Sequence, residues 1–218
     1  MPKNKTVLIF DFDGTFYTGK DIFSLLPEFV EKNRRQFLPQ LTDRQYEKIC
    51  KECPEWLNTI NGSETVKLLI SLKEKYPRYK ISIEDFWNWQ NENPYPLKFD
   101  KKQLIKPKFI KKLCEKFPVY IVSNSAPTHI KHHMKTLKLN PDWFDEIISN
   151  HFEEKDRTKQ HYYEDILRAE NTLPQNAYVF GDSVENDLIP AEKIGINTYF
   201  IEDVREIKKI IKKLKLKF

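Results

Sequence analysis

The chain has few cysteines and no long hydrophobic run, and both shortages restrict what it can be. Its three cysteines, Cys50, Cys53 and Cys114, are too few and too unevenly spaced for a disulfide framework or a structural zinc site. No stretch approaches the roughly 20 consecutive apolar residues that a membrane-spanning helix needs. The sequence also contains no internal repeat and no low-complexity tract. We therefore expect a water-soluble globular protein with ordinary thiols.

The amino-terminal residues Met-Pro-Lys-Asn-Lys contain no apolar signal-peptide segment and lead directly into a strand-like run. The expected compartment is therefore the cytoplasm. The sequence leaves the oligomeric state open.

Positive charge is concentrated at the C-terminal end of an otherwise almost neutral chain. The formal net charge is +5, and residues 205–218 alone carry +6, which leaves −1 for the rest. Apolar residues recur at helical spacing between these lysines, so we expect an amphipathic helix that exposes its basic face. Because no nucleic-acid-binding module is recognisable elsewhere, neither nucleic acid nor a membrane is expected as a partner.

Short apolar runs that end in polar residues predict a buried parallel sheet. The clearest runs are Lys5–Phe10, Pro118–Val122 and Ala177–Phe180, and weaker ones lie at Glu146–Ser149 and Ile196–Ile201. Helical periodicity at 109–117, 129–139 and 162–170 alternates with these runs. The sequence therefore predicts an α/β fold, a three-layer Rossmann-like core in which helices cover a parallel sheet of about five strands.

A long interval between the first two strands is expected to form a separate, mostly helical domain. It is too long for a simple crossover and lacks strand alternation. The expected domains are 17–97 for this insert, and 1–16 together with 98–218 for the core. Helical periodicity within the insert is found at 22–37, 43–57, 63–76 and 83–91.

Two pairs of acidic residues follow predicted strands. Asp11 and Asp13 come directly after the first strand, while Asp182 and Asp187 follow the strand that ends at Phe180. Because ligands bind outside the carboxyl ends of parallel strands, these side chains are expected to meet at one edge of the sheet. Four carboxylates so placed repel one another and require a cation, and an oxygen-only ligand set favours Mg²⁺.

Three of these polar segments resemble motifs of the haloacid dehalogenase-like (HAD) superfamily of phosphohydrolases. They read VLIFDFDGT, VYIVSNS and GDSVENDLIPA, in the family's order and over about 130 residues of core. The resemblance implies that Asp11 is the nucleophile, Asp13 the general acid and base, and Ser123 the phosphate-binding hydroxyl. It places Asp182 at the metal and Asp187 just outside the metal's direct ligands, and implies that the insert is the helical cap of the first subfamily.

The remaining roles follow from the same resemblance. Asn124 is expected to bind the substrate phosphate beside Ser123, and Mg²⁺ is expected to be held by Asp11, Asp182 and the backbone carbonyl of Asp13. The family's third motif is a lysine before the penultimate core helix, and here both Lys159 and Lys155 qualify. Lys159 is preferred because it lies closer to the helical run that follows.

The resemblance implies a Mg²⁺-dependent phosphatase that hydrolyses a small phosphorylated metabolite through an aspartyl-phosphate. Cleavage of a carbon–halogen bond needs no acid to protonate halide, so the presence of Asp13 favours phosphoryl chemistry. Two alternatives stay open: a phosphomutase of the same fold, and a non-catalytic binding protein on a phosphatase scaffold. The physiological substrate cannot be read from the sequence.

Three histidines follow the second motif on one expected helix. His129, His132 and His133 share one face of that helix, which suggests a metal site, but no fourth ligand is in reach. We therefore expect them to form an exposed basic face.

Overall fold

The computed structural model describes residues 5–18, 24–58, 62–98, 101–149 and 157–214. The chain divides into two compact units, each with its own interior. The sheet unit consists of Met1–Gly19 and Phe99–Phe218, and the helical unit consists of Lys20–Lys98. That the helical unit serves as a cap stays a prediction.

Five parallel strands form the sheet, in the order β3-β2-β1-β4-β5. The central strand β1 pairs with β2 on one side and with β4 on the other, so the three strands that lead to Asp11, Ser123 and Asp182 are neighbours. The strand bounds are β1 Val7–Phe10, β2 Val119–Ser123, β3 Glu146–Ser149, β4 Ala177–Gly181 and β5 Asn197–Phe200. The predicted parallel sheet is confirmed.

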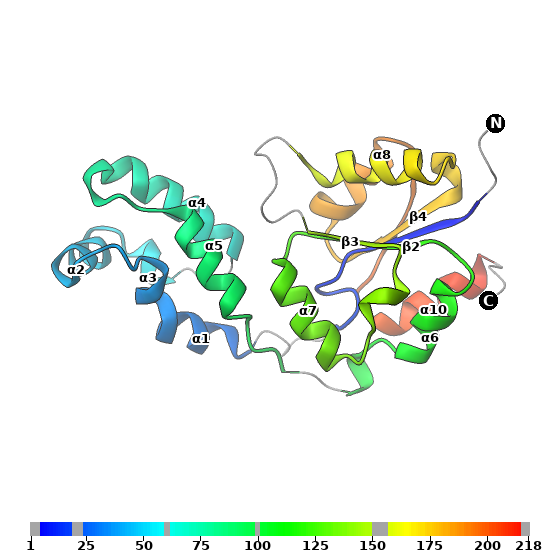
Figure 1. Cartoon of the computed structure of the whole chain (residues 1–218), viewed down its shortest axis with the longest axis horizontal. Helices are drawn as coiled ribbons and strands as arrows, with labels where there is room; N and C mark the ends of the chain where they lie inside the picture. The colour runs from blue at the N-terminus through cyan, green and yellow to red at the C-terminus, as the bar shows by residue number, and fades with distance from the viewer. Residues whose placement is uncertain (1–4, 19–23, 59–61, 99–100, 150–156, 215–218) are drawn as a thin grey trace. The chain divides into compact units, whose positions relative to one another are not determined.

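Helices cover both faces of this sheet, with α8 on one side and α6 and α10 on the other (Figure 1). The helices of the sheet unit are α6 Pro107–Cys114, α7 Pro127–Thr136, α8 Lys159–Ala169, α9 Ile189–Glu192 and α10 Val204–Lys213. Shorter turns are η3 Lys101–Gln103, η4 Pro141–Trp143, η5 Pro174–Asn176 and the π-type turn η6 Val184–Leu188. The result is the expected three-layer α/β core.

Successive side chains of β1 point to opposite faces of the sheet, and those on both faces are buried. Val7 and Ile9 belong to a core cluster that includes Tyr163 and Ile166 of α8, while Leu8 and Phe10, which point to the opposite face, are also fully buried. A strand that is apolar at every position therefore fits only an internal place in a sheet covered on both sides.

The basic C-terminal segment forms the amphipathic helix α10. Val204, Ile207 and Ile211 are buried, whereas Lys208 and Lys212 are exposed. The expected amphipathic helix is thus confirmed for the described residues. Its apolar stripe packs on the sheet unit, which leaves a row of lysines in solvent.

The helical unit contains short helices around an aromatic core that includes Phe37, Trp56 and Phe86. Thr42 and Ser82 cap two of these helices, since their side chains accept hydrogen bonds from the backbone N–H groups of Gln45 and Asp85. The elements are α1 Leu26–Asn33, η1 Arg34–Phe37, α2 Asp43–Glu52, α3 Glu55–Asn58, α4 Gly62–Lys75, η2 Pro77–Tyr79 and α5 Ile83–Glu92.

One predicted helix of this unit is divided in two. The periodic segment 43–57 breaks between Glu52 and Glu55 because Pro54 lacks the N–H that a continuing helix requires.

Cys50 and Cys53 are free thiols, as expected. Among the residues described, no helix is long and apolar enough to cross a bilayer.

Candidate active site

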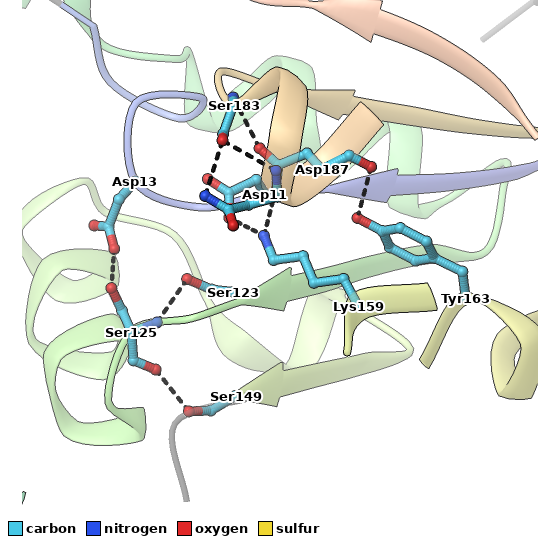
Figure 2. Close-up of polar contacts among 10 residues, drawn as sticks. Asp11, Asp13, Ser123, Ser125, Ser149, Lys159, Tyr163, Ser183 and Asp187 are labelled. Carbon is cyan, nitrogen blue, oxygen red and sulfur yellow. Dashed lines mark hydrogen bonds and ion pairs between the residues drawn. The ribbon is translucent and has the colours of Figure 1, made fainter. Parts of the chain in front are cut away.

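Polar residues from three strand ends lie close together at the carboxyl edge of the sheet. Asp11 directly follows β1, Ser123 is the last residue of β2, and Asp182 directly follows β4. Because these strands are parallel and adjacent, residues that end them in sequence lie side by side in space. Segments more than a hundred residues apart thus build one site, shown in Figure 2.

Three carboxylates form the centre of this site. Asp11, Asp182 and Asp187 each offer an oxygen atom, and these atoms all lie within 4.8 Å of one another. Asp11 and Asp187 are buried, whereas Asp182 is exposed. Because Asp11 and Asp182 lie this close together, they can share one cation.

Lys159 joins two of these carboxylates. Its Nζ donates to Asp11 Oδ1 at 2.7 Å and to Asp187 Oδ1 at 2.5 Å, and the side chain is only 3% exposed (Figure 2). The first turn of α8 brings it there, because α8 begins at Lys159 after the N-cap Thr158. Lys159, the preferred candidate for the phosphate lysine, thus lies at the acid cluster, while the alternative, Lys155, lies outside the described residues, and the phosphate-binding role of Lys159 stays a prediction.

The electrostatics of the cluster reflect burial and crowding. Burial, together with the charge of Asp187, raises the pKa of Asp11 to about 8 despite the opposing effect of Lys159. Burial and Asp187 also raise the pKa of Asp182 to about 6. For Lys159, burial favours the neutral amine, but Asp11 and Asp187 outweigh it and raise the pKa above its ordinary value. The three carboxyl groups offer oxygen ligands only, and such a donor set fits a hard divalent cation, which would offset the crowding of their charges.

Two glycines allow the acidic segments to approach so closely. Gly14 has φ +78°, and a Cβ atom there would overlap the carboxylate of Asp182. A Cβ atom on Gly181 would likewise collide with the side chain of Asp187. Both glycines are therefore needed for the geometry of the cluster itself.

Gly14→Ala is expected to displace Asp182 and to weaken both Mg²⁺ binding and turnover by about 100-fold, because a shift on the order of 1 Å at a reacting centre has that effect. The matched control is Gly195→Ala. Gly195 also has a positive φ, +82°, but its Cβ would meet only Pro174 at an ordinary 3.6 Å. The control should lose about 1 kcal/mol of stability and keep its activity. Calorimetric titration with Mg²⁺ checks both variants, and equal effects would contradict the role given to Gly14.

Asp13 points away from the acid cluster. Its carboxylate accepts hydrogen bonds from Ser125 and Tyr17, and His129 Nε2 lies 3.3 Å from its Oδ1. Figure 2 shows the Asp13 side chain directed toward Ser125 rather than toward Lys159. Burial opposes ionisation of Asp13, but the charge and hydrogen bond of His129 outweigh it and hold the pKa of Asp13 below its ordinary value.

The expected exposed histidine face is wrong for two of its three members. His129 and His133 are buried, at 4% and 1% exposure, and their rings are in contact, while His132 is exposed. The reason is that α7 begins directly after the polar end of β2, so its first turns face the same edge of the sheet as Asp13. The position of His129 shortly after β2 in the sequence is the signal that could have predicted its place near Asp13.

The predicted phosphate-binding residues lie at the same edge. Ser123 is buried, and its hydroxyl oxygen accepts a hydrogen bond from the backbone N–H of Ser125 at 3.1 Å. Asn124 and Lys159 line a cavity of about 580 Å³ together with Asn186. A cationic group and an amide thus line a space for a ligand, while Ser123 lies at the same edge of the sheet but does not line this cavity.

Comparison with known proteins identifies the family. A model described as haloacid dehalogenase-like hydrolase matches residues 5–195. A haloacid dehalogenase-like family hydrolase from Xanthomonas campestris is 14% identical, with a TM-score of 0.53 over 97% of this chain and 92% of that one. The HAD-hydrolase YfnB from Bacillus subtilis, solved bound to magnesium, is 18% identical, with a TM-score of 0.55 over 96% of this chain and 100% of that one.

A 2-haloacid dehalogenase from Pseudomonas syringae is 14% identical, with a TM-score of 0.50 over 96% of this chain and 99% of that one. At such identities these likenesses show the fold alone. No curated protein sequence matches the chain. Because the family model spans most of the sequence and the strand ends carry its motifs, the chain belongs to the haloacid dehalogenase-like hydrolase family.

Proposed function

We propose that the protein is a Mg²⁺-dependent phosphatase that hydrolyses a small phosphorylated metabolite through an aspartyl-phosphate on Asp11. The observation that carries this proposal is the position of Asp11 between a charged lysine and two further carboxylates. A phosphate monoester is an anion, so an anionic nucleophile can approach it only where positive charge is held in place.

The metal ligands proposed are Asp11, Asp182 and the backbone carbonyl of Asp13, with Asp187 as the neighbouring acid. The mutual approach of three carboxylate oxygens supports a hard cation, and a HAD-hydrolase of similar fold was solved bound to magnesium. When bound, Mg²⁺ supplies positive charge that offsets the repulsion between phosphoryl oxygens and the carboxylate.

In the first half of the proposed reaction, a carboxylate oxygen of Asp11 forms a bond to phosphorus while the bond from phosphorus to the ester oxygen breaks. Asp13 donates a proton to the departing oxygen. Lys159, Ser123 and Asn124 hold the phosphoryl oxygens and keep the reacting atoms in line. Asp187 keeps Lys159 charged and oriented through its ion pair.

In the second half, Asp13 takes a proton from water, and the resulting oxygen attacks phosphorus and releases Asp11. The low pKa of Asp13 suits this step, because its carboxylate form predominates at neutral pH. The first step needs the protonated form, which the negative charge of a bound phosphoryl group favours by raising the pKa of a nearby acid. Ser125, Tyr17 and His129 hold the Asp13 side chain away from the acid cluster in this structure, so both steps require its carboxyl group to turn toward Asp11.

The principal alternatives are a dehalogenase, a phosphomutase and a binding protein. Family membership alone does not distinguish them, since one protein of similar fold is a 2-haloacid dehalogenase. Asp13, with its three hydrogen-bonding partners, favours phosphoryl chemistry because a departing halide needs no proton. For the helical unit we propose the role of the substrate-selecting cap, on the family resemblance.

The test is turnover of p-nitrophenyl phosphate by the purified protein, with Mg²⁺ or with EDTA. We expect release of p-nitrophenol that requires the metal, and no halide release from 2-chloropropionate. A phosphomutase would instead show transfer that depends on a bisphosphorylated sugar. Absence of metal-dependent turnover on this ester and on a broad panel of phosphorylated metabolites would contradict the proposal.

Affinity for Mg²⁺ should depend on pH. Because the pKa of Asp11 is raised to about 8 without metal, the carboxyl is largely protonated below that pH and the ion must displace the proton. Affinity is therefore expected to rise about tenfold per pH unit toward pH 8 and then to level off. Calorimetry in two buffers of different protonation enthalpy measures the number of protons released when Mg²⁺ binds. In Asp11→Asn the proton release near pH 7 should fall to the small part that Asp182, with a pKa of about 6, still supplies, and pH-independent affinity of the wild type would contradict the prediction.

A further inference from the structure

A second cavity of about 500 Å³ lies in the sheet unit, between the segment that leads into α6 and the start of α10. None of its lining residues belongs to the acid cluster or to the cavity beside Lys159. Its volume falls within the range of small-molecule sites, about 300–1,000 Å³. The proposed hydrolysis makes no use of it.

The lining of this cavity is strongly basic. It contains five cationic side chains and, among the described residues, no acidic one: Lys101, Lys102, Lys106, Arg205 and Lys208. Arg205 is already paired with Asp203, with Nε to Oδ1 at 2.8 Å. Like charges around one cavity repel each other, so a ligand with at least two negative charges would relieve that repulsion.

The remaining lining residues are apolar. Ile105 and Val204 are buried, and Leu104 and Phe109 are partly exposed. These four lining residues are the apolar floor of the cavity. A cavity for inorganic phosphate alone would have no use for an apolar floor. The combination of lysines with an aliphatic and aromatic surface fits a ligand that carries both phosphates and a planar or apolar group.

The lysine side chains, rather than the N-terminal end of α10, attract the anionic ligand. The first backbone N–H groups of α10 are already bonded, from Val204 to Thr18 Oγ1 at 3.2 Å and from Arg205 to Asp203 Oδ1 at 2.8 Å. Recognition must therefore come from cationic side chains on two separate elements, η3 with its following residues and α10.

We propose that this cavity binds a small polyanion with an aromatic group, of the class of nucleoside diphosphates. The lysines of both elements contact the phosphates, and the apolar floor contacts the base. The site is independent of the active site, so its occupation requires neither Mg²⁺ at the acid cluster nor turnover.

The test is calorimetric titration of the full chain with ADP in the presence of EDTA. The double variant Lys101→Glu/Lys208→Glu reverses two lysines of the cavity, and the matched control Lys108→Glu/Lys212→Glu reverses two exposed lysines that do not line it, one on α6 and one on α10. We expect saturable binding that the first pair weakens at least about tenfold and the second leaves within about twofold. All four positions are exposed, and thermal melting checks that each variant is folded.

Pyrophosphate and a short single-stranded RNA are the comparison ligands. We expect pyrophosphate to bind several-fold more weakly than ADP, because it lacks a group for the apolar floor. The proposal is overturned if ADP does not bind, if both double variants weaken binding equally, or if pyrophosphate binds as tightly as ADP. It is also overturned if only RNA binds. Retention of ADP binding by Asp11→Asn separates this site from the proposed active site.

Discussion

Asp11→Asn is expected to reduce turnover of phosphate esters by at least about 10⁴-fold, the size of effect seen when a catalytic nucleophile is removed. The amide has nearly the same shape as the carboxylate but cannot form the phosphoryl bond. Folding should be preserved, because burial already disfavours the charged form of Asp11, as its raised pKa of about 8 shows. We expect a change in the free energy of unfolding within about 1 kcal/mol.

Initial rates with p-nitrophenyl phosphate and thermal melting measure these two effects. Asp142→Asn is the matched control, because it makes the same chemical change at an exposed acid that lines neither cavity. The control should keep wild-type rates. If Asp11→Asn retained a rate within tenfold of the wild type, Asp11 would not be the nucleophile.

Lys159→Met should affect both stability and activity. Lys159 is buried between Asp11 and Asp187, and its removal leaves the buried carboxylate of Asp187 without its lysine partner. Loss of one partner from a buried ion pair costs about 3 kcal/mol or more of folding free energy. Turnover should fall on the order of 10³-fold, because a fixed positive charge no longer faces the phosphoryl group. Urea unfolding and steady-state kinetics give the two magnitudes.

Added Mg²⁺ should recover part of the stability that Lys159→Met loses, since the ion supplies the missing positive charge. Lys193→Met serves as the control, because Lys193 lines the same cavity but is exposed. Combining Lys159→Met with Asp187→Asn should restore further stability, by removing the carboxylate that the first substitution leaves unpaired. A double variant less stable than Lys159→Met alone would show that charge pairing is not the reason for the loss.

The strands and their polar ends are predictable because both depend on local sequence. A run such as Val7–Phe10 is apolar at every position, which only an internal strand of a covered sheet accommodates. Asp11 and Asp182 follow such runs, and parallel pairing of neighbouring strands then brings them together. The divided helix at 43–57 shows the limit of periodicity, because Pro54 interrupts backbone hydrogen bonding without changing the apolar pattern.

The contacts of individual side chains were not predictable in the same way. Asp13 and Asp11 are two residues apart, yet Asp11 pairs with Lys159 and Asp13 contacts Ser125 and His129. Which partner each acid meets depends on the positions of the first turns of α7 and α8, which packing against the sheet decides. The buried position of His129 is a consequence of that packing, and an exposed face was the reasonable expectation from its sequence alone.

Local sequence is enough to predict that acidic and hydroxyl groups end three buried strands and that a glycine follows the first acidic pair. The position of Lys159 between Asp11 and Asp187, and the basic cavity beside α10, are visible only in the folded chain. The difference lies in the range of the interactions. Strand patterns and turns arise within a few residues, whereas ion pairs and cavities form between segments that meet only when the helices pack on the sheet.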